Sequence, residues 1–299
     1  MLSREILVVG YGSLLSGYGL LAERRGGASR LAARDVAPVA IHNARRGLAK
    51  PSSHGKYLAM DIEPVRPAAP ISASVGFGVG GIGGLLLTFD RECAPLIARR
   101  EEYDPGAFER LIEIAERAGK PVGEFLLEIA RGANFDLMAY RIALRDLIDY
   151  TSPGYIFHPV EIDDGRVAII AIGSGFDGSG DPRIISRRQE FGMDRLLSIE
   201  ESLRVELPAF DRAGQIGYCA ECVLGGLHGV DVGDLAAGID AEALWARELA
   251  AYLGPIAAGE RERFLAATSI DAARYGERFA LSSPRAAGFA ALLKLAGVV

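Results

Sequence analysis

The sequence lacks several features that would assign it to a broad functional class at once. It has three cysteines in 299 residues, too few for the disulfide framework of a small secreted protein. Its 33 basic residues are outnumbered by 39 acidic ones, and the net charge of −6 leaves no basic surplus for following a nucleic-acid backbone. We therefore do not expect a nucleic-acid binder. Long uncharged apolar runs are also missing, so we do not expect a membrane-spanning protein.

The first residues also lack the pattern of a secretory signal. The apolar run at residues 6–9 is too short for a signal-peptide core, and no small-residue cleavage site follows it. We therefore expect a cytoplasmic location. Apolar residues make up 49% of the chain and charged residues 24%, a composition that excludes intrinsic disorder and allows a substantial core.

Short apolar or alternating segments at both ends of the first 175 residues predict strands. The segment 71–89 is rich in glycine, which would weaken a helix, and we interpret it as a glycine-rich strand or barrel wall. The segments 155–162 and 166–172 flank Asp163-Asp164-Gly165, a favourable hairpin turn. The predicted strand regions are residues 5–9, 35–50, 71–89, 155–162 and 166–172.

Helical spacing dominates the middle and the end of the chain. Asp90 is a suitable N-cap for a helix reaching about Tyr103, and Asp104-Pro105 restarts the chain as N-cap and first helical residue. Residues 104–150 then predict a block of three helices. A glycine-rich loop at 173–181 predicts a boundary near residue 175, with a mostly helical region at 176–299.

The turn Gly10-Tyr11-Gly12-Ser13, directly after the first predicted strand, has three interpretations. A dinucleotide-binding G-x-G-x-x-G turn fits poorly, because Leu15 holds the third glycine position and Gly26-Gly27 interrupts the helix that should follow. The second interpretation is a cradle of backbone N–H groups for a phosphate, a carboxylate or a developing oxyanion. The third is a tight turn that needs glycine for its geometry alone.

Five segments, taken in order along the chain, resemble the γ-glutamylcyclotransferase-like superfamily, including its ChaC-type branch. They are the YGSL-type signature at residues 9–15, the arginine-bearing segment 43–48, the glycine and apolar strand 84–89, the L-x-x-R-E-like helix end 97–101, and Gly154-Tyr155. The similarity covers roughly residues 5–103 and 151–175. It therefore makes residues 104–150 a helical insertion and 176–299 an extension without a counterpart.

The resemblance implies an α+β fold built on a small mixed β-barrel and a reaction that needs no metal or organic cofactor. In that reaction the α-amine of a γ-glutamyl group attacks its own γ-carbonyl and releases 5-oxoproline and an amine or amino acid. It implies Glu101 as the general base, Tyr155 as a hydrogen-bonding partner of the substrate or the base, and a small γ-glutamyl compound as the substrate. The α-carboxylate of that substrate would be held by backbone amides of Tyr11, Gly12, Ser13 and Leu14.

Each of these residues also has a simpler interpretation. Glu101 stands in a charged stretch that fits a solvated helix end, and its neighbour Glu102 is the alternative base. Tyr155 fits a core aromatic residue, and Arg45 and Arg46 fit surface charges, although one of them could balance a substrate carboxylate. A binding protein without turnover and a nucleotide-binding enzyme remain alternatives to the cyclotransferase.

The remaining motifs are weak. Cys219 and Cys222 form a single C-x-x-C with His228 six residues further on, and thiols packed in a core explain it better than a zinc or redox site. Apolar stripes near the C-terminus fit core packing or the contacts of a homodimer. These stripes include Leu244, Leu249 and Leu253.

Overall fold

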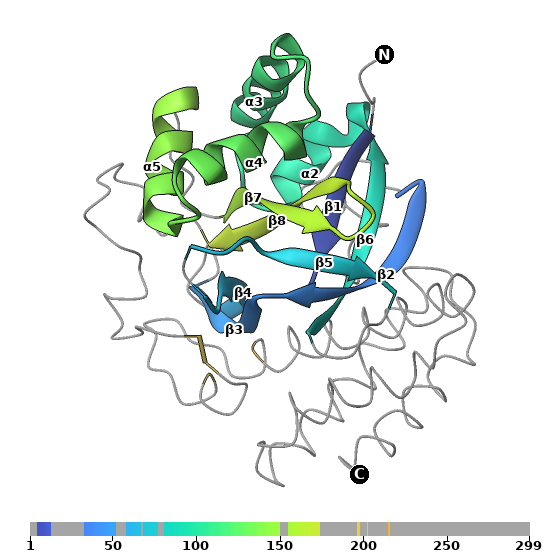
Figure 1. Ribbon diagram of the computed structural model, residues 1–299, viewed down its shortest axis with the longest axis vertical. Coiled ribbons are helices and arrows are strands. Elements are labelled where there is room, and N and C mark those ends of the chain that lie inside the picture. The colour runs from blue at the N-terminus through green and yellow to red at the C-terminus, as the bar shows by residue number, and fades with distance from the viewer. Residues whose placement is uncertain are drawn as a thin grey trace, which may run out of the picture.

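The computed structural model describes residues 5–12, 33–51, 58–66, 68–76, 81–149 and 155–173, and the single residues Leu196, Leu197, Ser202 and Gln215. Within these residues the fold is α+β, with a closed barrel of six strands, a separate two-stranded hairpin and four α-helices. Figure 1 shows α2, α3, α4 and α5 together on one side of the barrel and the β3–β4 hairpin on the other side.

The barrel is mixed, and its strand order is β1-β6-β2-β5-β7-β8. The pairs β1–β8 and β5–β7 are parallel, and the other neighbours are antiparallel. Closure brings β1, from the start of the chain, against β8, so the ends of these two strands can serve one site. The strands are β1 Glu5–Gly10, β2 Asp35–His42, β5 Ser72–Val75, β6 Ile82–Asp90, β7 Tyr155–Ile162 and β8 Val167–Gly173.

The predicted strand region 35–50 is in fact two strands, β2 and β3 (Ala44–Pro51), separated at Asn43. Asn43 has a φ of 53°, a left-handed conformation that asparagine tolerates better than most residues. Its side-chain amide donates to the carbonyls of Ala69 and Pro70 at 3.0 Å each, which holds the turn in place. The region 71–89 likewise contains two strands, β5 and β6.

The strand β4 (Leu58–Pro64) was not among the predicted elements. It pairs with β3 in an antiparallel hairpin in which Gly47 lies opposite Asp61, with an irregularity in register between Leu48 and Lys50. Leu48 also forms an isolated antiparallel bridge with Leu197, the N–H of each donating to the carbonyl of the other. The hairpin is therefore joined to a segment more than 100 residues further along the chain.

The predicted helix over 90–103 is shorter than expected. Asp90 is the last residue of β6, and its side chain makes no capping hydrogen bond. A single 3₁₀ turn, η2 (Arg91–Cys93), leads into α2 (Ala94–Arg100), and Glu101 is the C-cap of α2. The glutamate at the helix end is therefore fixed by the last turn of α2 rather than by a longer helix.

The three-helix block is confirmed by the structure. It consists of α3 (Pro105–Arg117), α4 (Val122–Gly132) and α5 (Leu137–Ile148). Asp104 caps α3 as predicted, because its Oδ1 accepts from the N–H of Ala107 at 2.7 Å. Gly123 lets α4 approach β8 closely, since a Cβ at this position would lie 2.4 Å from the carbonyl oxygen of Val167.

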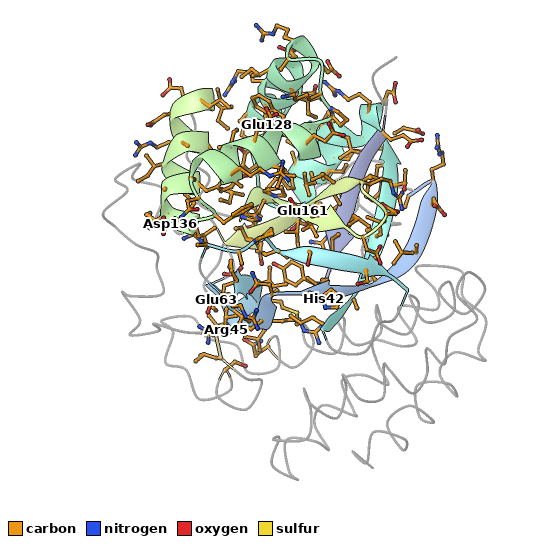
Figure 2. All side chains as sticks on the ribbon, in the orientation of Figure 1. His42, Arg45, Glu63, Glu128, Asp136 and Glu161 are labelled. Carbon is orange, nitrogen blue, oxygen red and sulfur yellow. The ribbon has the colours of Figure 1, made fainter. Side chains whose placement is uncertain are left out.

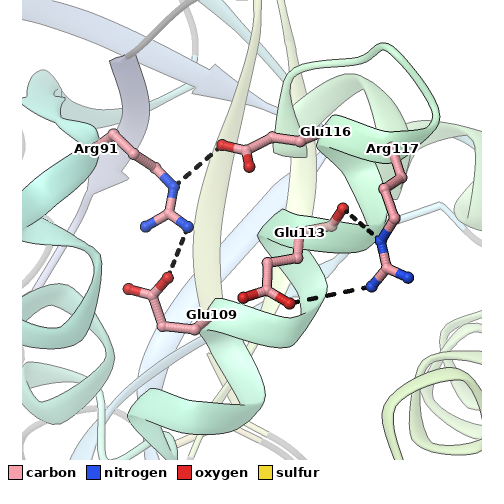
Figure 3. Close-up of polar contacts among 5 residues, drawn as sticks. All are labelled: Arg91, Glu109, Glu113, Glu116 and Arg117. Carbon is pink, nitrogen blue, oxygen red and sulfur yellow. Dashed lines mark hydrogen bonds and ion pairs between the residues drawn. The ribbon is translucent and has the colours of Figure 1, made fainter.

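Two ion pairs fasten the start of α2 to α3. Arg91 donates from Nη2 to Glu109 at 2.6 Å and from Nε to Glu116 at 3.2 Å, so one guanidinium spans two turns of α3 (Figure 3). Arg117, drawn in the same view, bonds Glu113 within its own helix.

Aromatic rings join the helices to the barrel. Phe157 on β7 lies 4.5 Å from Phe108 and 5.3 Å from Tyr103, measured between ring centroids. Tyr140 on α5 donates its hydroxyl to the carbonyl of Phe157 at 2.6 Å, which satisfies its polar end inside the core. No helix in the described part of the chain is long and apolar enough to cross a membrane.

Several expectations fall on residues outside the described set. They include Ser13, Leu14 and Leu15 of the glycine turn, Gly154, and the group Cys219, Cys222 and His228. The helices expected near the C-terminus and most of the region 176–299 lie there too.

Candidate functional site

Glu101 is directed inward by the turn that follows α2. Its N–H bonds the carbonyls of Ala98 and Ile97 at 3.1 and 3.2 Å, which closes the last helical turn. Glu102 then adopts a φ of 53°, and this left-handed residue reverses the chain. Glu101 is only 8% exposed, whereas Glu102 is exposed, so the two neighbouring carboxylates lie in different environments.

Tyr155, the first residue of β7, is buried and fixed by a hydrogen bond. Its hydroxyl donates to the carbonyl of Met60 on β4 at 2.6 Å. Burial raises the pKa of the Tyr155 phenol well above its ordinary value, and the nearby Tyr11, Asp61, Glu101 and Glu102 raise it further. Tyr155 is therefore a neutral phenol at neutral pH, and Glu101 is near enough to contribute to its raised pKa.

The end of β1 approaches the same strand. A Cβ on Gly12 would lie 3.3 Å from the Cβ of Met60, so the backbone after β1 packs directly against β4. Tyr11, 5% exposed, donates its hydroxyl to the carbonyl of Ala171 on β8 at 2.6 Å. Gly12 and Tyr155 are therefore neighbours of one residue, Met60, although 143 positions separate them in the chain.

The two arginines of the predicted arginine-bearing segment differ in position. Arg45 pairs with Glu63 across the β3–β4 hairpin and is mostly exposed, as Figure 2 shows. Arg46 donates from Nη1 to the carbonyls of Tyr11 and Gly83, both at 3.4 Å, and so holds the end of β1. Among the described residues of the predicted site, Tyr11 is contacted by Arg46 and not by Arg45.

The sequence analysis missed Asp61, a buried carboxylate that is 3% exposed and stands next to Met60. The sequence does contain a signal for this strand, because the apolar residues Leu58, Met60 and Ile62 stand at every second position. In the structure all three are buried. Leucine, alanine and methionine are not strong strand formers, which is why the pattern did not stand out.

Comparisons with protein-family models, curated proteins and solved structures gave no match. The site must therefore be interpreted from its own groups, which are the buried carboxylates of Glu101 and Asp61, the buried phenols of Tyr11 and Tyr155, and the backbone at the end of β1. In the described part of the chain no group of three or more His, Cys, Asp or Glu side chains is arranged to hold a metal ion. Carboxylates and phenols of this kind can hold an amine and transfer a proton.

Proposed function

We propose that the protein is a γ-glutamylcyclotransferase-like enzyme that cleaves a γ-glutamyl amide. The observation that carries the proposal joins three separate segments. Tyr155 at the start of β7 and Gly12 after β1 both lie against Met60, and the buried Glu101 at the end of α2 is close enough to raise the pKa of the Tyr155 phenol. These are the three places where the resemblance in the sequence puts a base, a phenol and a carboxylate-binding turn. The mixed barrel supports the same family type.

The proposed reaction forms one C–N bond and breaks another within the substrate. The α-amine nitrogen attacks the γ-carbonyl carbon, the tetrahedral intermediate collapses, and the amide bond to the leaving amine breaks. Glu101 takes the proton that the attacking nitrogen loses and returns it to the departing nitrogen, so no proton, electron or water is consumed overall. The products are 5-oxoproline and a free amine or amino acid.

Orientation supplies much of the acceleration in such a ring closure, because the nucleophile and the carbonyl belong to one molecule. In the proposed complex the backbone at Tyr11 and Gly12 holds the α-carboxylate of the glutamyl group. Arg46 keeps that backbone in place through the carbonyl of Tyr11. The hydroxyl of Tyr155 donates a hydrogen bond to the carbonyl of Met60, and in the proposed complex its oxygen also accepts one from the substrate amine.

Residues 104–150 are, on this proposal, an insertion between the base and the phenol. The chain leaves Glu101, forms α3, α4 and α5, and returns at Tyr155. The exposed position of Glu102 favours Glu101 as the base of the pair.

The test is to incubate the purified protein with a panel of γ-glutamyl amino acids, γ-glutamyl amines and glutathione, and to measure 5-oxoproline by mass spectrometry. We expect product from at least one substrate and a loss of about 100-fold or more in kcat/KM for Glu101→Gln. Glu113→Gln, at an exposed carboxylate on α3, is the matched control and should retain activity.

Other outcomes separate the alternatives. Loss of activity in Glu102→Gln with an active Glu101→Gln would move the base by one residue. Tight binding of a γ-glutamyl compound without product would indicate a binding protein, and binding of NAD or ATP instead would favour a nucleotide site. Absence of 5-oxoproline across the whole panel would refute the proposed activity.

A further inference from the structure

Asp61 is a buried carboxylate that the proposed reaction does not use. It is 3% exposed, and its Oδ1 accepts the N–H groups of Ile62 and Gly173, both at 2.8 Å. Gly173 ends β8, so a side chain of the hairpin strand β4 is bonded to the main chain of the barrel. Burying an ionised group costs free energy unless it is hydrogen-bonded, and these two bonds offset part of that cost.

The contact between Asp61 and Gly173 leaves no room for a larger residue. A Cβ on Gly173 would lie 2.4 Å from Oδ2 of Asp61, far inside normal contact. The other side of the same residue is held as well, because Arg141 of α5 donates from Nη2 to the carbonyl of Gly173. The end of β8 is thus fixed between an anion from β4 and a cation from the helical block.

The two strands that Asp61 joins, β4 and β8, also accept the hydroxyl hydrogen bonds of Tyr155 and Tyr11. Met60, adjacent to Asp61, accepts the hydroxyl of Tyr155. Ala171, two residues before Gly173, accepts the hydroxyl of Tyr11. A shift of β4 relative to β8 would therefore move both phenols relative to each other.

We propose that Asp61 is a positioning residue that ties β4 to β8 and so holds Tyr155 and Tyr11 in place around the candidate site. Its catalytic consequence rests on the proposed function, whereas its effect on the two tyrosines does not. Asparagine keeps a side-chain oxygen that can accept the same two N–H groups, and alanine keeps none, so the two variants separate the charge of Asp61 from its hydrogen bonds. Burial is the main cause of the raised pKa of the Tyr155 phenol, and Tyr11 and Asp61 add to it.

The experiment compares Asp61→Asn and Asp61→Ala with Asp163→Asn. Asp163 is the matched control, because its carboxylate also accepts a backbone N–H, from Val75 at 3.1 Å, but it is exposed. The protein is labelled with carbon-13 at the Cζ of tyrosine, and Tyr155 is assigned with Tyr155→Phe. Hydrogen exchange of the Gly173 amide and kcat/KM are measured in parallel.

In Asp61→Asn we expect the Gly173 amide to stay protected and the titration of Tyr155 to begin at lower pH than in the wild type. In Asp61→Ala we expect faster exchange at Gly173, a changed Tyr155 shift at neutral pH, and about a 100-fold loss of kcat/KM. Should Asp61→Ala fail to fold, Asp61→Ser, whose shorter side chain cannot reach both N–H groups as the carboxylate does, takes its place. A Gly173 exchange rate and a Tyr155 signal in that variant identical to those of Asp163→Asn would overturn the proposal.

The two proposals fail in different ways. If the protein forms no 5-oxoproline, the tyrosine and amide measurements still show whether Asp61 holds the site together. If the enzyme is active but Asp61→Asn and Asp61→Ala match the control in all three measurements, the positioning role is wrong and the function stands.

Discussion

Acidification is expected to destabilise the protein through one buried histidine on β7. His158 is 3% exposed, its ring packs edge-on against Tyr140 with 4.9 Å between centroids, and its Nδ1 lies 2.9 Å from the carbonyl of Pro159. Burial lowers the pKa of His158 from 6.5 to about 4; the bond to Pro159 opposes this shift, and the positive charge of Arg141 adds to it. The native protein therefore keeps a neutral imidazole where the unfolded chain would carry a charge.

The direction in which the free energy of unfolding changes with pH follows from proton binding. Between pH 6.5 and pH 4 the unfolded state binds a proton at His158 that the native state does not, so the free energy of unfolding falls as the pH falls. With about 1.36 kcal/mol for each pKa unit, His158 removes about 2 kcal/mol between pH 7 and pH 5, and about 3 kcal/mol by pH 4. These are large fractions of a typical stability.

The assay is urea denaturation at pH 7, 6 and 5, comparing the wild type with His158→Asn and His158→Phe. Asparagine keeps a donor near the position of Nδ1, and phenylalanine keeps a ring against Tyr140, but neither titrates. Contributions from carboxylates are common to all three proteins and cancel in the comparison. The reasoning is refuted if the stability of the wild type and of both variants declines in parallel between pH 7 and pH 5.

Two further predictions concern close contacts. Gln215 satisfies both backbone groups of Leu58, accepting its N–H at 2.7 Å and donating to its carbonyl at 3.1 Å, so Gln215→Ala should lower the unfolding free energy by about 2 kcal/mol in urea titrations; an unchanged midpoint would contradict this contact. Gly123→Ala should cost about 1–3 kcal/mol, because the new methyl group would meet the carbonyl of Val167. Gly132→Ala, with open space around it on the same helix, should be neutral or stabilising. Equal effects of the two alanines on thermal unfolding would show that α4 does not pack against β8 as described.

Local signals in the sequence predicted the elements whose formation depends on neighbouring residues. The turn at 163–165 and the apolar segments on either side of it predicted the β7–β8 hairpin, and Asp104-Pro105 predicted the start of α3. Elements decided by distant partners were predicted less well. The region 35–50 is divided at Asn43 because that side chain bonds Ala69 and Pro70, which no local pattern reveals.

The residues of the candidate site likewise fall into those that local segments predicted and those that depend on distant contacts. Glu101 and Tyr155 belong to recognisable segments and were predicted by number, although their role stays a prediction. The partner of Tyr155 is a backbone carbonyl, and any residue type at position 60 could supply it. Asp61 is functional in our proposal only because β4 and β8 meet, a contact between residues 112 positions apart.

The helical block bonds strands of the candidate site even though it stands between Glu101 and Tyr155 in the sequence. If a short loop replaced the helical block between Glu101 and Tyr155, two hydrogen bonds would be lost. They are the bond from Tyr140 to the carbonyl of Phe157 and the bond from Arg141 to the carbonyl of Gly173. It would also uncover His158, which would then meet water and take up a proton near its ordinary pKa. Because Arg141 holds the carbonyl of Gly173 and Asp61 holds its N–H, the block is coupled through this one residue to the strand that carries the acceptor of Tyr155. The helices are therefore part of what fixes the site, and their removal should impair it even if the barrel itself still folds.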